Sequence, residues 1–379
     1  MERAAFVDWV YSEEQDELQR TVRRFVRDKQ PMPAVRQVMG TEAGYDPAVW
    51  RQMAGQLGLQ ALGIPEEYGG AGCGQVELGI VLDELGRALY PGPFFSSAVL
   101  AAGTLLACGD EGAKKELLPG LASGEIIGTT AWVEDSGRWD VAEVSMQAAR
   151  SGDGYVLTGR KNFVTDGHIA DLILVAARTR TGLSLFAVTA DAPGLSRTAL
   201  PTLDPTRRLA RLDFAGVPAR LVGTDGGAEA GLVTALQLAS AALAAEQIGG
   251  ADQCLTMSVG YAKERVQFGR PIGSYQAVKH KLADMHIEIE LTKSAVRHAA
   301  WLADHQASEL PAAASLAKAY ASEAYWHAAV ETIQTHGGIG FTWEHDAHLY
   351  YKRAKTSQVL LGDPGYHREL LARHIGLGG

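Results

Sequence analysis

Apolar residues recur at helical spacing in the first part of the chain. Leu18, Val22, Phe25 and Val26 place apolar side chains on one face, and Ser12-Glu-Glu-Gln15 ahead of them has the form of a capping box. Similar periodic segments follow at residues 50–57, 76–89 and 98–106, so the chain is predicted to be helical up to about residue 124. A glycine-rich stretch at 65–72 is either a helix connection or the rim of a ligand cleft.

Short β-type runs replace the helical spacing after Gly128. They are separated by Gly, Asp and Pro and lie at residues 144–148, 155–157, 172–176, 183–188 and 209–214. The helical pattern returns after Gly223, with a long helix at 228–267, a second from Tyr275, and others at 312–336 and 366–375. This order predicts an α+β protein with a helical domain at 1–125, a β-domain at 126–224 and a helical domain at 225–379.

Composition and charge narrow the class of partner. The 379 residues are 46% hydrophobic and 21% charged, which is typical of a globular protein with a large core. The net charge is −9, from 35 basic and 44 acidic residues, and no dense basic block occurs. We therefore expect neither a nucleic acid nor a membrane surface as partner.

The cysteines and the apolar runs bear on localisation. Cys73, Cys108 and Cys254 are few and unpatterned, so neither a disulfide framework nor a CxxC metal site is predicted. The N-terminus lacks the apolar core of a signal peptide, and the alanine-rich run at 235–245 is too short for a membrane span. A reducing cytoplasm is the expected location.

Three segments carry candidate chemistry. Arg265-Val-Gln-Phe-Gly-Arg-Pro271 should end the long helix, since Gly269 can cap a helix and Pro271 cannot continue one. Gln334-Thr-His-Gly-Gly-Ile-Gly340 is a glycine-rich turn, and Gly159-Arg-Lys-Asn-Phe-Val-Thr-Asp-Gly167 lies in the predicted β-domain. Taken alone, the first is compatible with a solvated turn between helices and the second with an ordinary helix C-terminus.

Together and in this order, the segments resemble the acyl-CoA dehydrogenase family, and the resemblance runs from Ser12 to Leu371. It implies an N-terminal all-α domain, a middle β-barrel or sandwich and a C-terminal four-helix bundle. It also implies FAD as cofactor, an acyl-CoA thioester as substrate and an electron-transferring flavoprotein or another electron acceptor. The expected assembly is a homo- or hetero-tetramer built as a dimer of dimers.

The resemblance assigns flavin contacts at two of the segments. Arg265 and Phe268 match the Arg and Phe that contact the FAD of a neighbouring subunit. A guanidinium suits that role because it is a permanent charge with a planar fork of donors for diphosphate oxygens. Gln334, Gly337 and Gly338 match the family's glycine turn, in which backbone N–H groups approach the cofactor.

Further flavin contacts are implied in the β-domain. Phe163 and Thr165 match the aromatic residue and the Thr beside the isoalloxazine ring, while Asp166 replaces the usual Asn. A core strand is the competing interpretation of Phe163. Upstream, Val133-Glu-Asp-Ser-Gly-Arg-Trp-Asp140 matches the flavin- and thioester-contacting segment in length but lacks its Thr, Pro and Ser.

The family's catalytic base has no direct counterpart. Ungapped alignment places Leu361 at the position of the usual Glu. The alternative base on the long helix falls on Ala239, and the helix Arg that assists thioester binding falls on Ser240.

Two carboxylates are candidate substitutes. Asp363 lies two residues beyond the expected site, and Pro364 holds it extended; the alternative is an exposed turn aspartate. Glu246 lies among small residues of the long helix and is either a base or a buried structural carboxylate paired with an Arg. His336, His345 and His348 cluster without a complete ligand set, so no metal site is predicted.

Three functions follow from the resemblance. The first is an FAD-dependent acyl-CoA dehydrogenase that forms a 2,3-enoyl-CoA, with Asp363 as base. The second is a base-deficient structural partner subunit of a heteromeric dehydrogenase, which lends Arg265 and Gln334 to the other chain's flavin. The third is a flavin oxidase or monooxygenase. Residues 337–345 and 361–368 resemble bacterial members that act on sterol side-chain or other bulky acyl groups.

Overall fold

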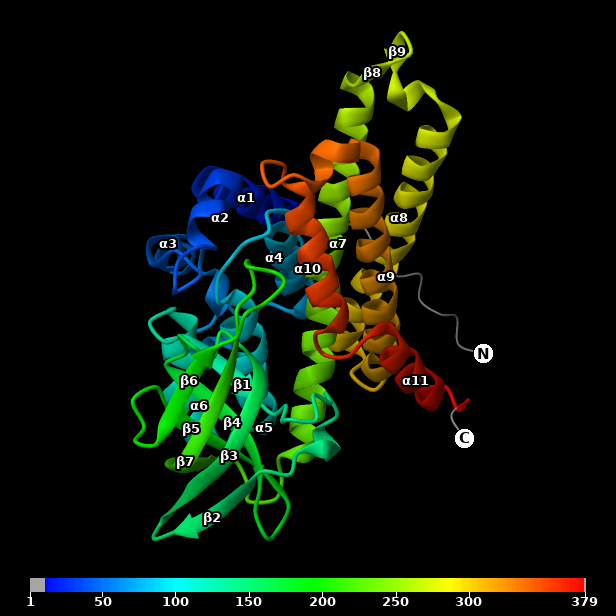
Figure 1. Cartoon of the computed structure of the whole chain (residues 1–379). Helices are drawn as coiled ribbons and strands as arrows, with labels where there is room; N and C mark the ends of the chain where they lie inside the picture. The colour runs from blue at the N-terminus through cyan, green and yellow to red at the C-terminus, as the bar shows by residue number, and fades with distance from the viewer. Residues whose placement is uncertain (1–10, 378–379) are drawn as a thin grey trace.

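The computed structural model describes residues 11–377, and it begins with a helical region (Figure 1). The predicted capping box is confirmed at α1 (Glu13–Lys29), where Ser12 Oγ accepts from Gln15 N at 3.2 Å and Ser12 N donates to Gln15 Oε1 at 3.1 Å. The other elements of this region are α2 (Met32–Val38), α3 (Pro47–Leu57), 3₁₀ turns at Leu59–Ala61 and Glu66–Tyr68, α4 (Gln75–Arg87), a π-helix (Phe95–Ala101), α5 (Ala102–Cys108) and α6 (Glu111–Ala122).

A barrel-like sheet follows the helical region. Its strands are β1 (Gly128–Ala131), β2 (Gln147–Ser151), β3 (Gly154–Thr165), β4 (Leu172–Arg178), β5 (Leu183–Thr189), β6 (Leu195–Ala199) and β7 (Leu209–Val222). The pairings β4–β2, β2–β3, β3–β7, β7–β5 and β5–β4 return the sheet to β4, so it closes. Leu157, Phe186 and Leu212 are among the side chains that fill its interior. The predicted middle β-domain is confirmed.

The C-terminal region is a bundle of long helices. Its elements are α7 (Glu229–Glu264), the short strands β8 (Val266–Gln267) and β9 (Arg270–Pro271), a 3₁₀ turn (Ile272–Ser274), α8 (Gln276–His305), α9 (Leu310–His336), a 3₁₀ turn (Gly337–Phe341), α10 (Ala347–Val359) and α11 (Pro364–His374). Figure 1 shows α7, α8, α9 and α10 running alongside one another. The helical–β–helical order predicted from the sequence is confirmed.

Glycines let α4 and α7 approach each other closely. A Cβ on Gly86 would lie 1.9 Å from the Glu246 carbonyl oxygen, and one on Gly249 would lie 1.9 Å from the Asp83 carbonyl oxygen. The middle of α7 is consequently enclosed by other elements. By length and composition α7 could cross a membrane. However, 67% of its most apolar 18-residue stretch is buried inside the protein, as in the core helix of a globular domain.

Several elements differ from the periodicity-based prediction. Residues 144–146 precede β2 rather than forming it, and β1, β6 and α10 were not predicted. β1 is short and buried at every position, so it shows no alternation, whereas β6 is a mostly exposed edge strand. α10 hides its helical pattern because its buried side includes the polar residues His348, Arg353 and Ser357.

Candidate active site

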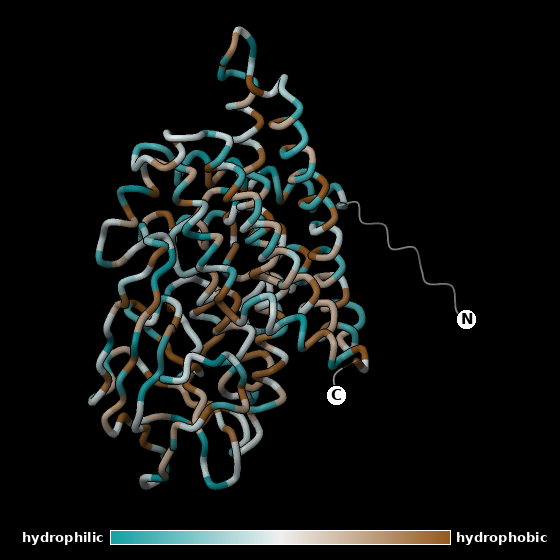
Figure 2. The backbone as a smooth tube through the Cα atoms, turned by 45° about the vertical axis from the view of Figure 1, so that its right-hand side comes forward, coloured by the Kyte–Doolittle hydropathy of each residue, from teal (hydrophilic) through white to brown (hydrophobic). Residues whose placement is uncertain are grey.

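The arginine segment forms an exposed hairpin at the end of the bundle. α7 stops at Glu264, and Phe268 and Gly269 have φ values of 51° and 80°, the backbone of a type I′ turn between β8 and β9. Gly269 therefore shapes a hairpin turn and does not cap the helix, which corrects the predicted role of this glycine. We call residues 265–275 the tip. Figures 1 and 2 show it projecting beyond the rest of the chain, and Phe268 is 93% exposed.

The glycine-rich turn lies at the same end of the bundle as the tip. α9 ends at His336, whose ring stacks on that of Tyr261 with 4.4 Å between centroids, and Tyr261 lies one helical turn before Arg265. Gly337 follows with φ 62°, a conformation that favours glycine. Gln334, Gly337 and Gly338 are exposed. The structure thus brings together two segments that are far apart in the sequence.

A bulge in β3 turns Phe163 toward a cavity. The register of β3 against β7 shifts between Lys161 and Val164, and Phe163 takes φ 54°. Its ring is 41% exposed and lines a cavity of about 530 Å³, the Phe163 cavity, together with Thr356 and Leu360. The core-strand interpretation of this ring is therefore the weaker one.

Val133 and Thr165 do not line the Phe163 cavity. Val133 is almost fully buried in the main core, and its carbonyl oxygen accepts from Asn162 N at 2.8 Å. Thr165 is also buried, and its carbonyl oxygen accepts from Thr129 Oγ1 at 2.6 Å. The structure thus leaves both residues outside this cavity, and their assignment as flavin contacts stays a prediction.

The residues assigned to FAD form two groups, one at the tip and one in the β-domain, and the two groups differ in how they could hold the cofactor. Arg265 and Phe268 are exposed and face away from their own chain, so they suit a diphosphate and a ring held by another chain. Figure 1 shows the tip at the opposite end of the molecule from the β-domain that carries Phe163. Within a single chain the two groups therefore lie in regions well apart from each other.

The segment 133–140 is fastened in place by Glu134 and Trp132. Glu134 accepts from the buried Lys161 Nζ at 2.8 Å and from Met146 N at 2.8 Å. Burial lowers the pKa of Lys161 to about 8, although the neighbouring Glu134 carboxylate favours its charged form. Trp132 Nε1 donates to the Trp139 carbonyl oxygen at 3.0 Å, which fixes the far end of the segment.

Trp139 stands between two cavities. It lines the Phe163 cavity, and it also lines a second cleft of about 180 Å³, the Leu361 cavity, with Ser240 and Leu361. The adjacent Leu360 and Leu361 are divided in the same way, one to each cavity. When residues 133–140 are aligned without gaps to the family's Thr-Glu-Pro-Gly-Ala-Gly-Ser-Asp, Trp139 matches the Ser, so a bulky ring replaces a hydroxyl between the two cavities.

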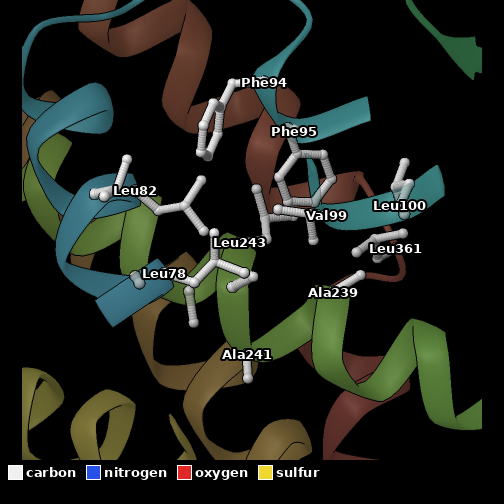
Figure 3. Packing of buried hydrophobic residues seen from close by; sticks show 14 of the residues in the cluster. Leu78, Leu82, Phe94, Phe95, Val99, Leu100, Ala239, Ala241, Leu243 and Leu361 are labelled. Carbon is white, nitrogen blue, oxygen red and sulfur yellow. The ribbon is translucent and has the colours of Figure 1, made fainter. Parts of the chain in front are cut away.

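Leu361 is part of the hydrophobic core. It is 4% exposed and belongs to the same buried cluster as Ala239, Val99 and Leu100, and Figure 3 shows it beside Ala239. Its φ of 62° is unfavourable for a residue with a Cβ, so the surrounding packing must hold it there. Both positions where the family places a base are therefore apolar in this chain.

Glu246 is committed to a buried ion network. It accepts from Arg207 Nη2 and from Arg353 Nη1, the latter at 2.9 Å, and Arg353 Nε also donates to Asp204 at 2.7 Å. Burial alone would raise the pKa of Glu246, but the two guanidinium groups hold it below its ordinary value. Glu246 lines neither cavity, so the structure favours a structural carboxylate paired with arginine over a base.

Asp363 is an exposed N-cap residue of α11. Its Oδ1 accepts from Tyr366 N at 2.8 Å, and its backbone is extended as Pro364 requires. Its side chain lines a further cleft of about 450 Å³ with Trp139 and Tyr366. It does not line the Leu361 cavity, so the structure does not bring it to the aligned base position.

Lys318 is a buried cation near this loop that the sequence reasoning missed. Its Nζ donates to Ser322 Oγ at 2.9 Å, to Gln358 O at 3.2 Å and to Gly362 O at 3.1 Å. Burial lowers its pKa to about 7. A lysine within the alanine-rich run of α9 was the available signal, because its neighbours predict a buried helix face. Lys318 holds the end of α10 and the loop that carries Leu361.

The histidine cluster does not form a metal centre. His336, His345 and His348 stack with one another or with Tyr261 and Trp343. Burial lowers the pKa of both His336 and His348. Within residues 11–377, no group of three or more His, Cys, Asp or Glu side chains is placed to hold a metal ion.

The sequence matches the three domains of one enzyme family. Residues 12–125 match the acyl-CoA dehydrogenase N-terminal domain, residues 129–217 the acyl-CoA dehydrogenase middle domain, and residues 227–376 the acyl-CoA dehydrogenase C-terminal domain.

Similar proteins agree with these matches. Acyl-CoA dehydrogenase IpdE2 of Mycolicibacterium smegmatis is 39% identical over 362 residues, which cover 96% of this chain and 98% of the relative. Among solved structures, the Tcur3481-Tcur3483 steroid ACAD has a TM-score of 0.87 and 36% identity, covering 96% of this chain and 98% of the other. The ChsE4-ChsE5 complex of Mycobacterium tuberculosis has a TM-score of 0.89 and 32% identity, covering 98% and 100%.

Proposed function

The chain belongs to the acyl-CoA dehydrogenase family, and we propose that it is the base-deficient subunit of a heteromeric dehydrogenase acting on a steroid-type acyl-CoA thioester. The reaction removes an α-proton and a β-hydride from the acyl group to give a 2,3-enoyl-CoA. When FAD is bound, it supplies the hydride acceptor. The companion chain supplies the base that this chain lacks.

The buried Leu361 carries this proposal. The α-proton of a thioester is weakly acidic, so its removal needs a positioned base, and a carboxylate of raised pKa is well suited to it. At the aligned base position this chain has an alkyl side chain that is 4% exposed and packed in the core. The other family position, Ala239, is equally apolar. Both positions therefore contribute packing in place of proton transfer.

The exposed tip suggests what this chain contributes instead. Arg265 and Phe268 face solvent, and the aligned flavin contacts Gln334, Gly337 and Gly338 lie at the same end of the bundle. We assign these residues to the flavin of the companion chain. The likeness to a steroid ACAD and to the ChsE4-ChsE5 complex supports both the substrate class and the assembly from two kinds of chain. Electrons would leave the reduced enzyme to an electron-transferring flavoprotein or another acceptor.

A second candidate function rests on Asp363. Its carboxylate is exposed and lines the cleft beside Trp139, so it is accessible to a thioester bound in that cleft. In that case the chain would be a self-sufficient dehydrogenase with Asp363 as base.

The flavin content and native mass of the chain separate the two candidates. Expressed alone, a base-deficient subunit is expected to hold well under one FAD per chain and to show no acyl-CoA dehydrogenation. Co-expression with a companion dehydrogenase chain should give a heteromer that binds FAD and turns over. A homo-oligomer of this chain alone with one FAD per chain and turnover would overturn the proposal in favour of Asp363.

A further inference from the structure

The tip contains a second arginine, Arg270, to which the family resemblance assigns no role. The Arg270 guanidinium lies over the ring of Tyr275, with 4.0 Å from its carbon to the ring centroid. Tyr275 is the last residue before α8, and its hydroxyl donates to the Gln267 carbonyl oxygen at 3.0 Å. The same ring meets the Phe268 ring edge-on, at 6.4 Å and 85°. Tyr275 thus contacts both strands and the turn of the hairpin.

The hairpin register places the two arginines on one face. Gln267 pairs with Arg270 and Val266 with Pro271, and Ile272 N donates to the Arg265 carbonyl oxygen at 2.8 Å. Side chains two apart on a strand share a face, as do directly opposed ones, so Arg265, Gln267 and Arg270 point to the same side. Arg265 and Arg270 are diagonal neighbours, a relation that places Cβ atoms about 7–8 Å apart.

Neither guanidinium is neutralised by its own chain. Both arginines are exposed, and no ion pair within residues 11–377 includes Arg265 or Arg270. Two like charges at this separation repel, so their placement on one face gains nothing in the isolated chain. A doubly charged anion between them would convert that repulsion into two charge-assisted interactions.

We propose that Arg270 is a second binding residue for the diphosphate of the companion chain's FAD and that Tyr275 positions it. This inference rests on the proposed function, which assigns the tip to that flavin. Tyr275 supports the position of Arg270 in two ways. Its ring holds the guanidinium by a cation–π contact, and its hydroxyl secures the hairpin strand that carries Gln267.

The test is an FAD titration of the apo-heteromer, read by flavin fluorescence at low and high salt. Arg270→Ala is expected to raise the FAD dissociation constant about tenfold at low salt, the size expected for one lost hydrogen bond to a charged group. The loss should shrink at high salt because exposed charges are screened. Tyr275→Leu should reproduce a large part of the effect, whereas Tyr275→Phe, which keeps the ring, should change the constant less than about threefold.

Two comparison variants make the outcome decisive. Arg150→Ala removes an exposed arginine of β2 and should leave the FAD dissociation constant unchanged, and circular dichroism should confirm that every variant folds. If Arg265→Ala weakens FAD binding and Arg270→Ala does not, the role of Arg270 is overturned while the proposed function stands. If neither substitution changes FAD binding, the placement of the tip against a companion's flavin is wrong as well.

Discussion

The tip and the loop around Leu361 differ in how many of the family's functional residues they keep. At the tip, the residues that match the family's flavin contacts are present and exposed, although Phe268 leaves an aromatic ring in water. Around Leu361, both base positions carry buried apolar side chains, and the position of the thioester-assisting Arg carries the buried Ser240. Phe268 is 93% exposed although its ring meets that of Tyr275 edge-on, and such a ring on the surface is best explained by a partner, whereas a buried Leu is explained by the core itself.

The two regions should also differ in how substitutions act. Changes at the tip should affect the binding of flavin and leave the free energy of unfolding nearly unchanged, because its side chains make few contacts within the chain. Changes around Leu361 should mainly affect stability, because that region holds three domains together through buried contacts. Substitutions in the buried ion network and in and around the Leu361 loop probe this difference, from the largest expected effect to the smallest.

Arg353→Ala should destabilise the chain most. It removes the partner of two buried carboxylates, Glu246 and Asp204, and such losses typically cost about 3–5 kcal/mol. Urea denaturation would measure the change in the free energy of unfolding. Arg373→Ala is the matched control, since its ion pair with Glu369 is exposed and should contribute less than about 1 kcal/mol. Equal effects of the two substitutions would mean that the buried network stabilises the fold no more than a surface ion pair does.

Leu361→Glu should lower the free energy of unfolding by about 3 kcal/mol, because it combines loss of a core side chain with burial of a carboxyl group. It should not create turnover, since Trp139 still separates the two cavities. Leu361→Met keeps the apolar volume and should cost less than about 1.5 kcal/mol. Acyl-CoA dehydrogenation by Leu361→Glu in the isolated chain would contradict this prediction. It would mean that the chain lacks only the catalytic base and has every other part of the active site.

Lys318 should make the stability of the Leu361 loop depend on pH. Burial lowers its pKa from 10.5 to about 7, so between these values the unfolded chain binds more protons than the folded chain. Stability from this group therefore rises as the pH increases through that window, by about 2 kcal/mol from pH 7 to 9. Comparing urea unfolding of the natural chain and Lys318→Met at both pH values isolates the effect. The same pH slope in both proteins would exclude Lys318 as its source.

Asp363→Asn should have the smallest effect. Asn is as good an N-cap residue as Asp, so the free energy of unfolding should change by less than about 0.5 kcal/mol. Turnover of the heteromer should stay within about twofold, because the base lies in the companion chain. Steady-state kinetics of the two heteromers would check this. Loss of turnover with retained flavin would instead make Asp363 the base. The region around Leu361 would then be catalytic, as the tip is functional, and the two regions would no longer differ in this way.

Local signals explain the parts of the structure that were predicted well. The capping box at Ser12 and the stop signal near Pro271 each act within a few residues, so the sequence shows them directly. β1 and α10 were missed because burial on both faces, or burial of polar side chains, removes the periodic pattern. Gly269 was assigned to a helix cap, whereas the type I′ hairpin uses its positive φ.

The sequence by itself determined the order of helical and β regions, the family motifs and the absence of a carboxylate at both expected base positions. The tertiary structure decided what the remaining groups do. It placed Arg207 and Arg353 on Glu246, Trp139 between two cavities, and Tyr275 beneath Arg270. The physical reason is that caps and turns depend on neighbours along the chain, whereas ion pairs, cavity walls and ring contacts depend on side chains that only folding brings together.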